Sequence, residues 1–338
     1  MKHWFVLLRS TPGRVGFNAV LALLLALVML ASLRFGALKL TYGEILETLW
    51  FRPEGIDWQI LWNIRLPRIL LGVLVGGGLA VSGAILQGIM RNPLAAPGLI
   101  GVSAGGGLAG ILILLVLPQY GCLLVPAAFA GALLTAALVY LLAWKQGVSP
   151  VRLILAGVAV SAMLGAFSST VLLLNAEKAG GVLDFTIGSL SARSWPQVRM
   201  AAPYMAAGLL VAFCSGRKLN ILALGDEVAT GLGMRVERTR FVLLAAAALL
   251  AASAVSVAGL LGFVGLIAPH IVRIAIGPDN RFVLPASALF GGILVAGCDT
   301  VGRMAMYPSS AELPVGVILS LLGPPFFLWL LRRRNYEA

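Results

Sequence analysis

Arg65-Leu-Pro-Arg68 opens the stretch of sequence that decides the fold, which continues through Ser82, Gly83 and Gln87 and closes with Arg91-Asn-Pro-Leu-Ala-Ala-Pro97. Two arginines stand before a long apolar run, and an Asn-Pro pair follows it. The run has the length, roughly 17 to 25 residues, that a helix needs to cross the hydrocarbon of a bilayer. The stretch therefore predicts a transmembrane helix over residues 69–90.

Apolar runs of similar length follow along the rest of the chain, at residues 17–35, 99–117, 123–142, 153–174, 200–215, 241–258, 261–276, 283–301 and 315–331. With the first run they predict about ten spanning helices joined by short connections. Glycine recurs inside the runs, as in Gly72 and Gly76 or in Gly291-Gly292. Small residues let helix backbones approach closely in lipid. The sequence therefore predicts an all-α, polytopic membrane protein forming one compact bundle, with residues 1–338 as a single transmembrane domain.

The composition leads to the same class. The chain is 60% hydrophobic and 11% charged, whereas a soluble globular protein has about half apolar and a quarter charged residues. Its net charge of +12 could indicate a nucleic-acid partner, but the basic residues lie in short segments between the spans and form no stripe. We therefore expect membrane lipid around the chain and no nucleic acid. The three cysteines show no CxxC spacing, which argues against a zinc site.

The basic residues also predict the orientation. An even number of spans places both termini on one side, and that side then holds Lys2, Arg9, Arg14, Arg91, Lys145, Arg152, Arg217, Lys218, Arg235, Arg238, Arg240, Arg273, Arg281 and residues 332–334, which is most of the 25 basic residues. Cytoplasmic segments carry such an excess of lysine and arginine. We therefore expect a multi-pass protein of the cytoplasmic (inner) cell membrane with both termini in the cytoplasm.

Missing motifs restrict the function. Ion-coupled carriers keep ionisable groups near the membrane centre, but Asp299 is the one acid inside a predicted span, and Arg303 at i+4 is placed to neutralise it. This disfavours a secondary transporter. Gly101-Val-Ser-Ala-Gly105 matches a hydrolase nucleophile motif without the required partners, so an intramembrane enzyme is disfavoured too. No GxxxxGK[ST] is present. We therefore expect a passive pore or a transporter driven by another subunit.

Three further motifs, together with the first stretch, carry a resemblance that covers nearly the whole chain. They are Leu219-Asn-Ile-Leu-Ala-Leu-Gly-Asp-Glu-Val-Ala-Thr-Gly-Leu-Gly233, Gly262-Phe-Val-Gly-Leu-Ile-Ala-Pro-His270 and Glu312-Leu-Pro-Val-Gly316. In order and spacing the chain resembles the iron-siderophore, haem and cobalamin permeases of ABC importers. The resemblance implies a permease without enzymatic activity, which moves a ferric siderophore across the membrane. Haem and cobalamin are the alternatives, because nothing in the residues separates the three substrates.

The resemblance also implies partners. The chain would pair with a second permease, its twin or a paralogue, and with two ATPase subunits and an extracytoplasmic substrate-binding protein. It would bind no cofactor itself, because ATP and magnesium belong to the ATPase. Residues 216–240 would form the cytoplasmic coupling loop, and within it a short helix and turn would contact the ATPase through Gly225, Asp226, Glu227, Ala229, Gly231 and Gly233. The alternative is an ordinary solvated loop.

The same resemblance assigns an outer docking site and a pathway. Arg65 and Arg68 stand at i and i+3, on one side of a helix end, and snorkelling to lipid head groups would explain them without a partner. By resemblance they join Arg303 in meeting carboxylates of the binding protein. The pathway would be lined by residues such as Ser161, Met163, Ser168 and Ser169. By resemblance Ala-Pro-His270 is a helix-breaking structural element near the inner side, and a lone histidine cannot hold a metal by itself, so no metal site is expected.

Overall fold

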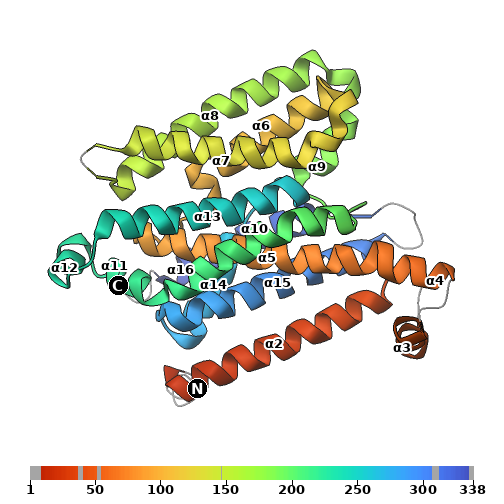
Figure 1. Ribbon diagram of the computed structural model, residues 1–338, viewed down its shortest axis with the longest axis horizontal. Helices are drawn as coiled ribbons and strands as arrows, with labels where there is room; N and C mark the ends of the chain where they lie inside the picture. The colour runs from red at the N-terminus through yellow and green to blue at the C-terminus, as the bar shows by residue number, and fades with distance from the viewer. Residues whose placement is uncertain (1–8, 37–40, 52–54, 146, 307–311, 335–338) are drawn as a thin grey trace.

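The structure is a computed structural model that describes residues 9–36, 41–51, 55–145, 147–306 and 312–334. The long helices lie side by side in one elongated bundle (Figure 1). They are α2 (Thr11–Arg34), α5 (Leu66–Met90), α6 (Val102–Leu115), α7 (Leu124–Ala143), α8 (Pro150–Leu174), α10 (Trp195–Cys214), α13 (Val236–Ala258), α14 (Val264–Ile276), α15 (Asn280–Ala305) and α16 (Val315–Arg334).

These helices confirm the predicted all-α membrane fold. In the described part of the chain, seven helices have the length and apolar composition to cross a membrane, and α6, α14 and α16 are shorter apolar helices. Each coincides with one of the predicted runs. The boundaries shift by a few residues, as at the second span, where a short helix α4 (Ile56–Gln59) and a π-helical segment η1 (Ile60–Arg65) lead directly into α5.

Short helices gather at the two ends of the bundle (Figure 1). One end, called here the α3 end, carries α3 (Tyr42–Phe51), α4 and α9 (Leu183–Ile187). The other, called the α12 end, carries α11 (Gly216–Ala223) and α12 (Asp226–Gly231). The helix α2 begins and α16 ends at the α12 end. An even number of crossings therefore separates them, as the sequence predicts.

The helix α5 lies at the centre, because glycines on it allow neighbouring backbones to approach. In its most apolar window 83% of the residues are buried, and it packs against α15, α13 and α14. A Cβ atom at Gly76 would overlap the carbonyl oxygen of Gly291, and one at Gly83 would overlap that of Gly265. Close packing through small residues is thus confirmed for α5 against α15 and α14.

Polar side chains of the first stretch join α5 to its neighbours. Ser82 Oγ donates to the carbonyl oxygen of Ala247 at 2.7 Å, and Gln87 Nε2 donates to that of Gly265 at 3.3 Å. The second bond has a specific cause. Pro269 has no N–H for the carbonyl four residues earlier, and Gln87 supplies the missing donor.

The prediction that Ala-Pro-His270 breaks a helix is wrong. The helix α14 runs from Val264 to Ile276 through Pro269, because the donor from α5 compensates for the proline. The interruption lies earlier, between the end of α13 and Phe263, which has φ 64°.

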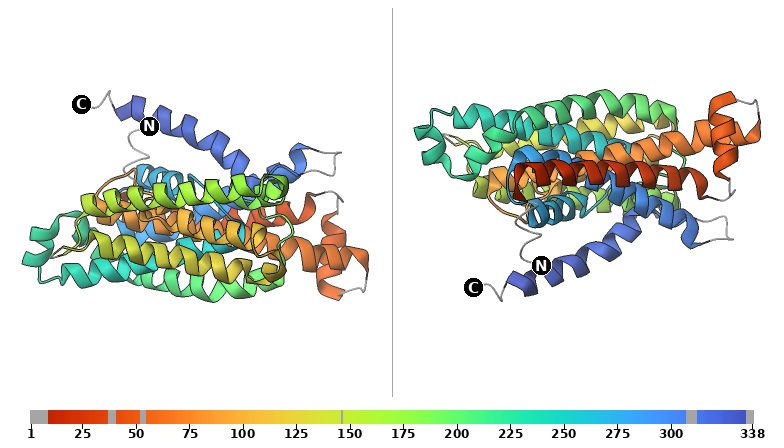
Figure 2. Two further views of the ribbon diagram at one scale, coloured as in Figure 1. Left: turned by 90° about the horizontal axis from the view of Figure 1, so that it is seen from above. Right: turned by 90° about the horizontal axis from the view of Figure 1, so that it is seen from below.

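The helices α8 and α16 are among those that the rest of the chain covers poorly. Only 11% of the apolar window of α8 is buried. The helix α16 leaves the bundle towards the α12 end (Figure 2), and its Leu321, Leu322 and Leu328 are exposed. These faces are left for lipid or for another subunit to cover.

Candidate functional site

The predicted coupling loop forms two short helices at the α12 end. The helices α11 and α12 are joined through Gly225, which has φ 113°, a conformation that glycine adopts without strain. Gly233 follows α12 with φ 79°. The predicted short helix and turn are therefore present, and both glycines are explained by backbone geometry.

A buried arginine fixes α12 to the bundle. Arg240 of α13 donates from Nη2 to both carboxylate oxygens of Asp226 at 2.8 Å, and from Nη1 to Glu237 Oε1 at 2.7 Å. Its side chain is 2% exposed, and a charge so deeply buried requires such partners. Arg91, at the end of α5, lies 3.3 Å from the same Asp226 carboxylate. The start of α12 is therefore tied to both α13 and the central helix.

The opposite side of α12 is apolar and exposed. Leu224, Val228 and Leu232 are 62%, 49% and 63% exposed, and Glu227 lies beside them with an exposed side chain. A Cβ atom at Gly231 would meet nothing within 4 Å. Exposed apolar side chains grouped in this way mark interaction surfaces. We call Leu224, Glu227, Val228, Gly231 and Leu232 the α12 face.

The predicted coupling residues thus divide into two groups. Glu227 and Gly231 belong to the α12 face, whereas Asp226 and the fully buried Ala229 hold the helix in place. Leu224, Val228 and Leu232 are not among the predicted coupling residues. Their spacing of four residues, which places them on one side of a helix, is the signal that could have revealed them.

A second ionic cluster anchors α11. Asp279, which precedes α15, accepts from Asn220 Nδ2 at 2.7 Å and lies 3.2 Å from Arg14 Nη1 and 2.7 Å from Arg281 Nη2. The hydrogen bond from Arg281, followed by that from Asn220, lowers the pKa of the Asp279 carboxyl to about 2, against the opposing effect of burial. The helices α2, α11 and α15 therefore meet at one ionised carboxylate.

At the α3 end, the three predicted docking arginines lie near the Asp299 carboxylate and the C-terminal end of α2. Arg68 Nη2 is 2.9 Å from Asp299 Oδ1, and Arg68 Nη1 is 2.6 Å from Glu312 Oε2. Arg303 Nε is 3.3 Å from Asp299 Oδ2, so the predicted pair of Asp299 with Arg303 is confirmed. The closer partner of Asp299 is Arg68, which is remote in sequence.

The carbonyl groups at the end of α2 accept from the other guanidinium groups. Arg65 donates to Leu33 and Arg34, and Arg303 donates to the carbonyl of Phe35 at 3.2 Å. Cations are favoured at the C-terminal end of a helix. The side chains of Arg68 and Arg303 are 9% and 5% exposed, and that of Glu312 is 35% exposed. The arginines are brought together as predicted, but they face inward.

The predicted pathway residues all lie on α8 but not on one face. Ser161 and Ser168 are partly buried, and Ser168 Oγ donates to the Leu164 carbonyl at 2.9 Å. Met163 is 50% exposed, and Ser169 is exposed as well. A cavity of about 540 Å³ lies elsewhere, next to α16, where Ser103, Thr186 and Ser320 contribute hydroxyl groups to its lining.

His270 lies on α14 with its ring centroid 6.4 Å from that of Phe326 on α16. Among the described residues no three His, Cys, Asp or Glu side chains come together as a metal site would require. The geometry of His270 therefore shows helix packing.

The sequence matches a family profile and is similar to several known permeases along most of its length. A sequence profile described as the FecCD transport family matches residues 23–333. The iron(3+)-hydroxamate import system permease of Bacillus subtilis is 41% identical over 94% of this chain and 96% of its own length. The cobalamin import system permease of Halobacterium salinarum is 43% identical over 92% and 83%. The hemin transport system permease of Yersinia pestis is 39% identical over 94% and 95%.

A solved structure has the same fold over nearly all of the chain. It is described as a metal-chelate type ABC transporter in an inward-facing conformation. It superposes with a TM-score of 0.83 at 30% identity, over 94% of this chain and 98% of its own.

Proposed function

The chain belongs to the FecCD transport family and is an ABC importer permease, and on that premise we propose that it carries a ferric siderophore with energy from a separate ATPase. Relatives named for iron(3+)-hydroxamate and for Fe(3+)-citrate import support this substrate class. Relatives named for cobalamin and hemin are similarly close, so haem and cobalamin are the alternatives.

One observation carries the coupling to an ATPase, namely the two-sided construction of α12. Its outer side is the apolar α12 face, which fits a groove on a protein partner better than water. Its inner side is tied through Asp226 to Arg240 on α13 and Arg91 on α5. A partner that displaces α12 when it binds ATP would therefore pull on the two most buried long helices. On this proposal the α12 end and both chain termini face the cytoplasm.

A second permease would cover α16. The exposed leucines of α16 and its departure from the bundle leave an apolar surface (Figure 2). The cavity of about 540 Å³ borders the same helix. In a pair of permeases this cavity would lie between the subunits, where a bulky chelate could pass, and ATP-driven movement would open it to one side at a time.

An extracytoplasmic binding protein would dock at the α3 end by replacing one of the carboxylates that the arginines contact there. Arg68 is held by Glu312, the most exposed carboxylate of its cluster. A carboxylate on the binding protein could take the place of Glu312, whereas Asp299 would continue to neutralise the buried charge. Docking through such pairs contributes mainly orientation and association rate.

The experiment that tests the substrate is reconstitution in vesicles with the ATPase and the binding protein that accompany this permease. Uptake and ATP turnover would be compared for a ferric hydroxamate, ferric citrate, haemin and cobalamin. We expect a ferric siderophore to stimulate both. Stimulation by haemin or cobalamin alone would show that the substrate assignment is wrong. Uptake in the absence of ATP would show that a separate ATPase does not drive transport.

A further inference from the structure

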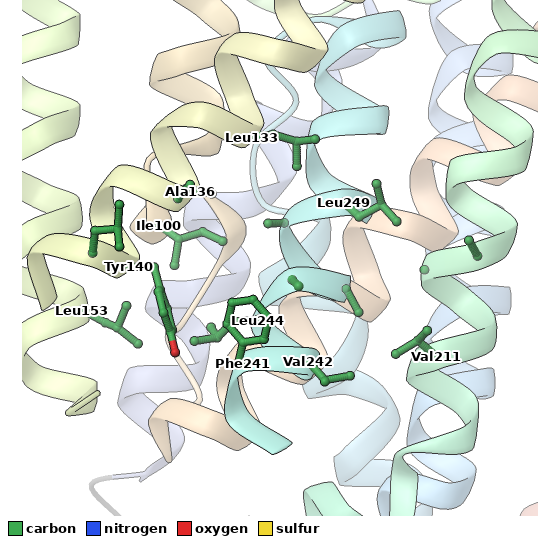
Figure 3. Close-up of a pocket in the computed structure, with 17 residues that line it drawn as sticks. Ile100, Leu133, Ala136, Tyr140, Leu153, Val211, Phe241, Val242, Leu244 and Leu249 are labelled. Atoms are coloured by element: carbon green, nitrogen blue, oxygen red, sulfur yellow. The ribbon is translucent and has the colours of Figure 1, made fainter. Parts of the chain in front are cut away.

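An apolar groove runs along the outside of the bundle between α7 and α10. Its volume is about 660 Å³, within the roughly 300–1,000 Å³ of small-molecule sites. The helix α13 forms its floor with Leu244 and Leu249, and Leu133 and Val211 stand on its two sides (Figure 3). Tyr140 is the one lining residue with a polar side chain. All three helices have the length and apolar composition to cross a membrane, which puts the groove at the depth of the lipid chains.

A cationic pocket adjoins the groove at the α12 end. It also has about 660 Å³, and Lys218 of α11 lines it together with Arg235 and Arg238 at the start of α13. Val242 lines both the groove and this pocket, so the two lie next to each other. Aromatic pairs lie along the groove, Phe129 with Tyr204 towards the α3 end and Tyr140 with Phe241 towards the α12 end.

Within the described part of the chain, the three cations of the pocket form no ion pair. Of the carboxylates nearby in sequence, Asp226 and Glu237 pair with Arg240, and Glu227 is exposed on the α12 face. An anion would therefore complete the pocket.

We propose that this composite site binds an anionic phospholipid, with one acyl chain in the groove and the phosphate among Lys218, Arg235 and Arg238. An apolar channel at membrane depth that ends in unpaired cations at one surface matches the build of such a lipid. The bound headgroup would bridge α11 and α13, the two elements that flank α12. Anionic lipid thus stabilises the position of α12 in the complex.

Native mass spectrometry of the full permease tests the headgroup. The probes are phosphatidylglycerol and phosphatidylcholine, added to the detergent-purified protein. We expect selective retention of phosphatidylglycerol, and roughly a fivefold loss of its affinity for each cation removed in Lys218→Gln, Arg235→Gln and Arg238→Gln. Arg217→Gln is the matched control, because Arg217 is exposed next to Lys218 but does not line the pocket. Equal binding of phosphatidylglycerol by the triple variant and the wild type would overturn the proposal.

A second pair of variants tests the acyl chain. Ala207→Phe fills the groove, whereas Ala206→Phe adds the same ring at the neighbouring exposed position, which does not line it. We expect only Ala207→Phe to lower retention of the lipid. Equal retention in both would contradict the groove as its site. If the triple variant loses its ATPase subunit while still retaining phosphatidylglycerol, the cations serve the protein partner and the lipid proposal is wrong.

Discussion

The two ends of the bundle both contain buried arginines, but they present opposite surfaces. At the α12 end, Arg240 is buried and its carboxylate partners Asp226 and Glu237 are 45% and 42% exposed. At the α3 end, Asp299 is itself 5% exposed and is shared by Arg68 and Arg303. The first network holds a helix whose free side is apolar. The second network holds the buried guanidinium groups of Arg68 and Arg303, and the more exposed Glu312 pairs with Arg68. The apolar α12 face is suited to a long-lived protein interface. The arginine cluster at the α3 end is suited to a reversible, charge-directed one.

The largest expected effect comes from removing the shared carboxylate. Asp299→Ala should leave Arg68 and Arg303 buried without their common partner and lower the free energy of unfolding by about 3–5 kcal/mol. The loss would be measured as a lower midpoint of thermal unfolding of the detergent-purified protein, with size-exclusion chromatography as the readout of the protein that remains folded. Glu312→Gln is the control, because its partly exposed pair with Arg68 should contribute only about 0–1 kcal/mol. Equal effects would show that Asp299 has no special place in the cluster.

The next effect concerns the α12 face. Leu232→Asp or Val228→Asp should weaken association with the ATPase subunit by at least about fivefold, since a buried apolar contact contributes more than about 1 kcal/mol. Glu227→Arg and Gly231→Leu should also impair assembly or uncouple ATP hydrolysis from uptake. Co-purification and substrate-stimulated ATP turnover are the measurements. Unchanged values in all four variants would leave α12 without a coupling role.

A smaller effect sharpens the comparison at the α3 end. Glu312→Gln should release Arg68 towards the outside and raise the association rate of the binding protein several-fold at low salt. The gain should shrink as salt screens the charges over about 8 Å at physiological ionic strength. Association kinetics in nanodiscs would measure it, with Glu44→Gln on α3 as the control. A slower rate would identify Glu312 as a docking group and Arg68 as a structural one.

The smallest expected effect is the dependence of stability on pH at Asp279. Its folded pKa of about 2 lies below the ordinary 3.8, so its contribution is present above about pH 4 and is lost as the pH falls towards 2. Asp279→Asn should remove that acid-sensitive part and cost about 1 kcal/mol at neutral pH, given the partial exposure of its partners. Unfolding midpoints from pH 7 to pH 2 would show it. If the unfolding midpoints of variant and wild type fell in parallel as the pH is lowered, Asp279 would not be the source of the acid-sensitive stability.

The membrane class, the positions of the apolar helices and their packing through glycine follow from the sequence alone. These follow from run length, composition and the small residues inside the runs, which are local properties. The sequence also determined the pair of Asp299 with Arg303, because residues four apart meet on any helix. The resemblance of its motifs then pointed to the family that the comparison confirmed. The ATPase coupling and docking roles of individual residues remain predictions.

The partners of charges that are remote in sequence follow only from the packing of the folded helices. Arg68 meets Asp299 across 231 positions and Glu312 across 244, and Arg91 meets Asp226 across 135, separations at which sequence spacing carries no geometric information. The structure also showed that α14 continues through Pro269, because the donor comes from Gln87 on another helix. Helix formation in lipid is dictated by the chain's own backbone and apolar surface. Which buried charge meets which partner depends on how the finished helices pack.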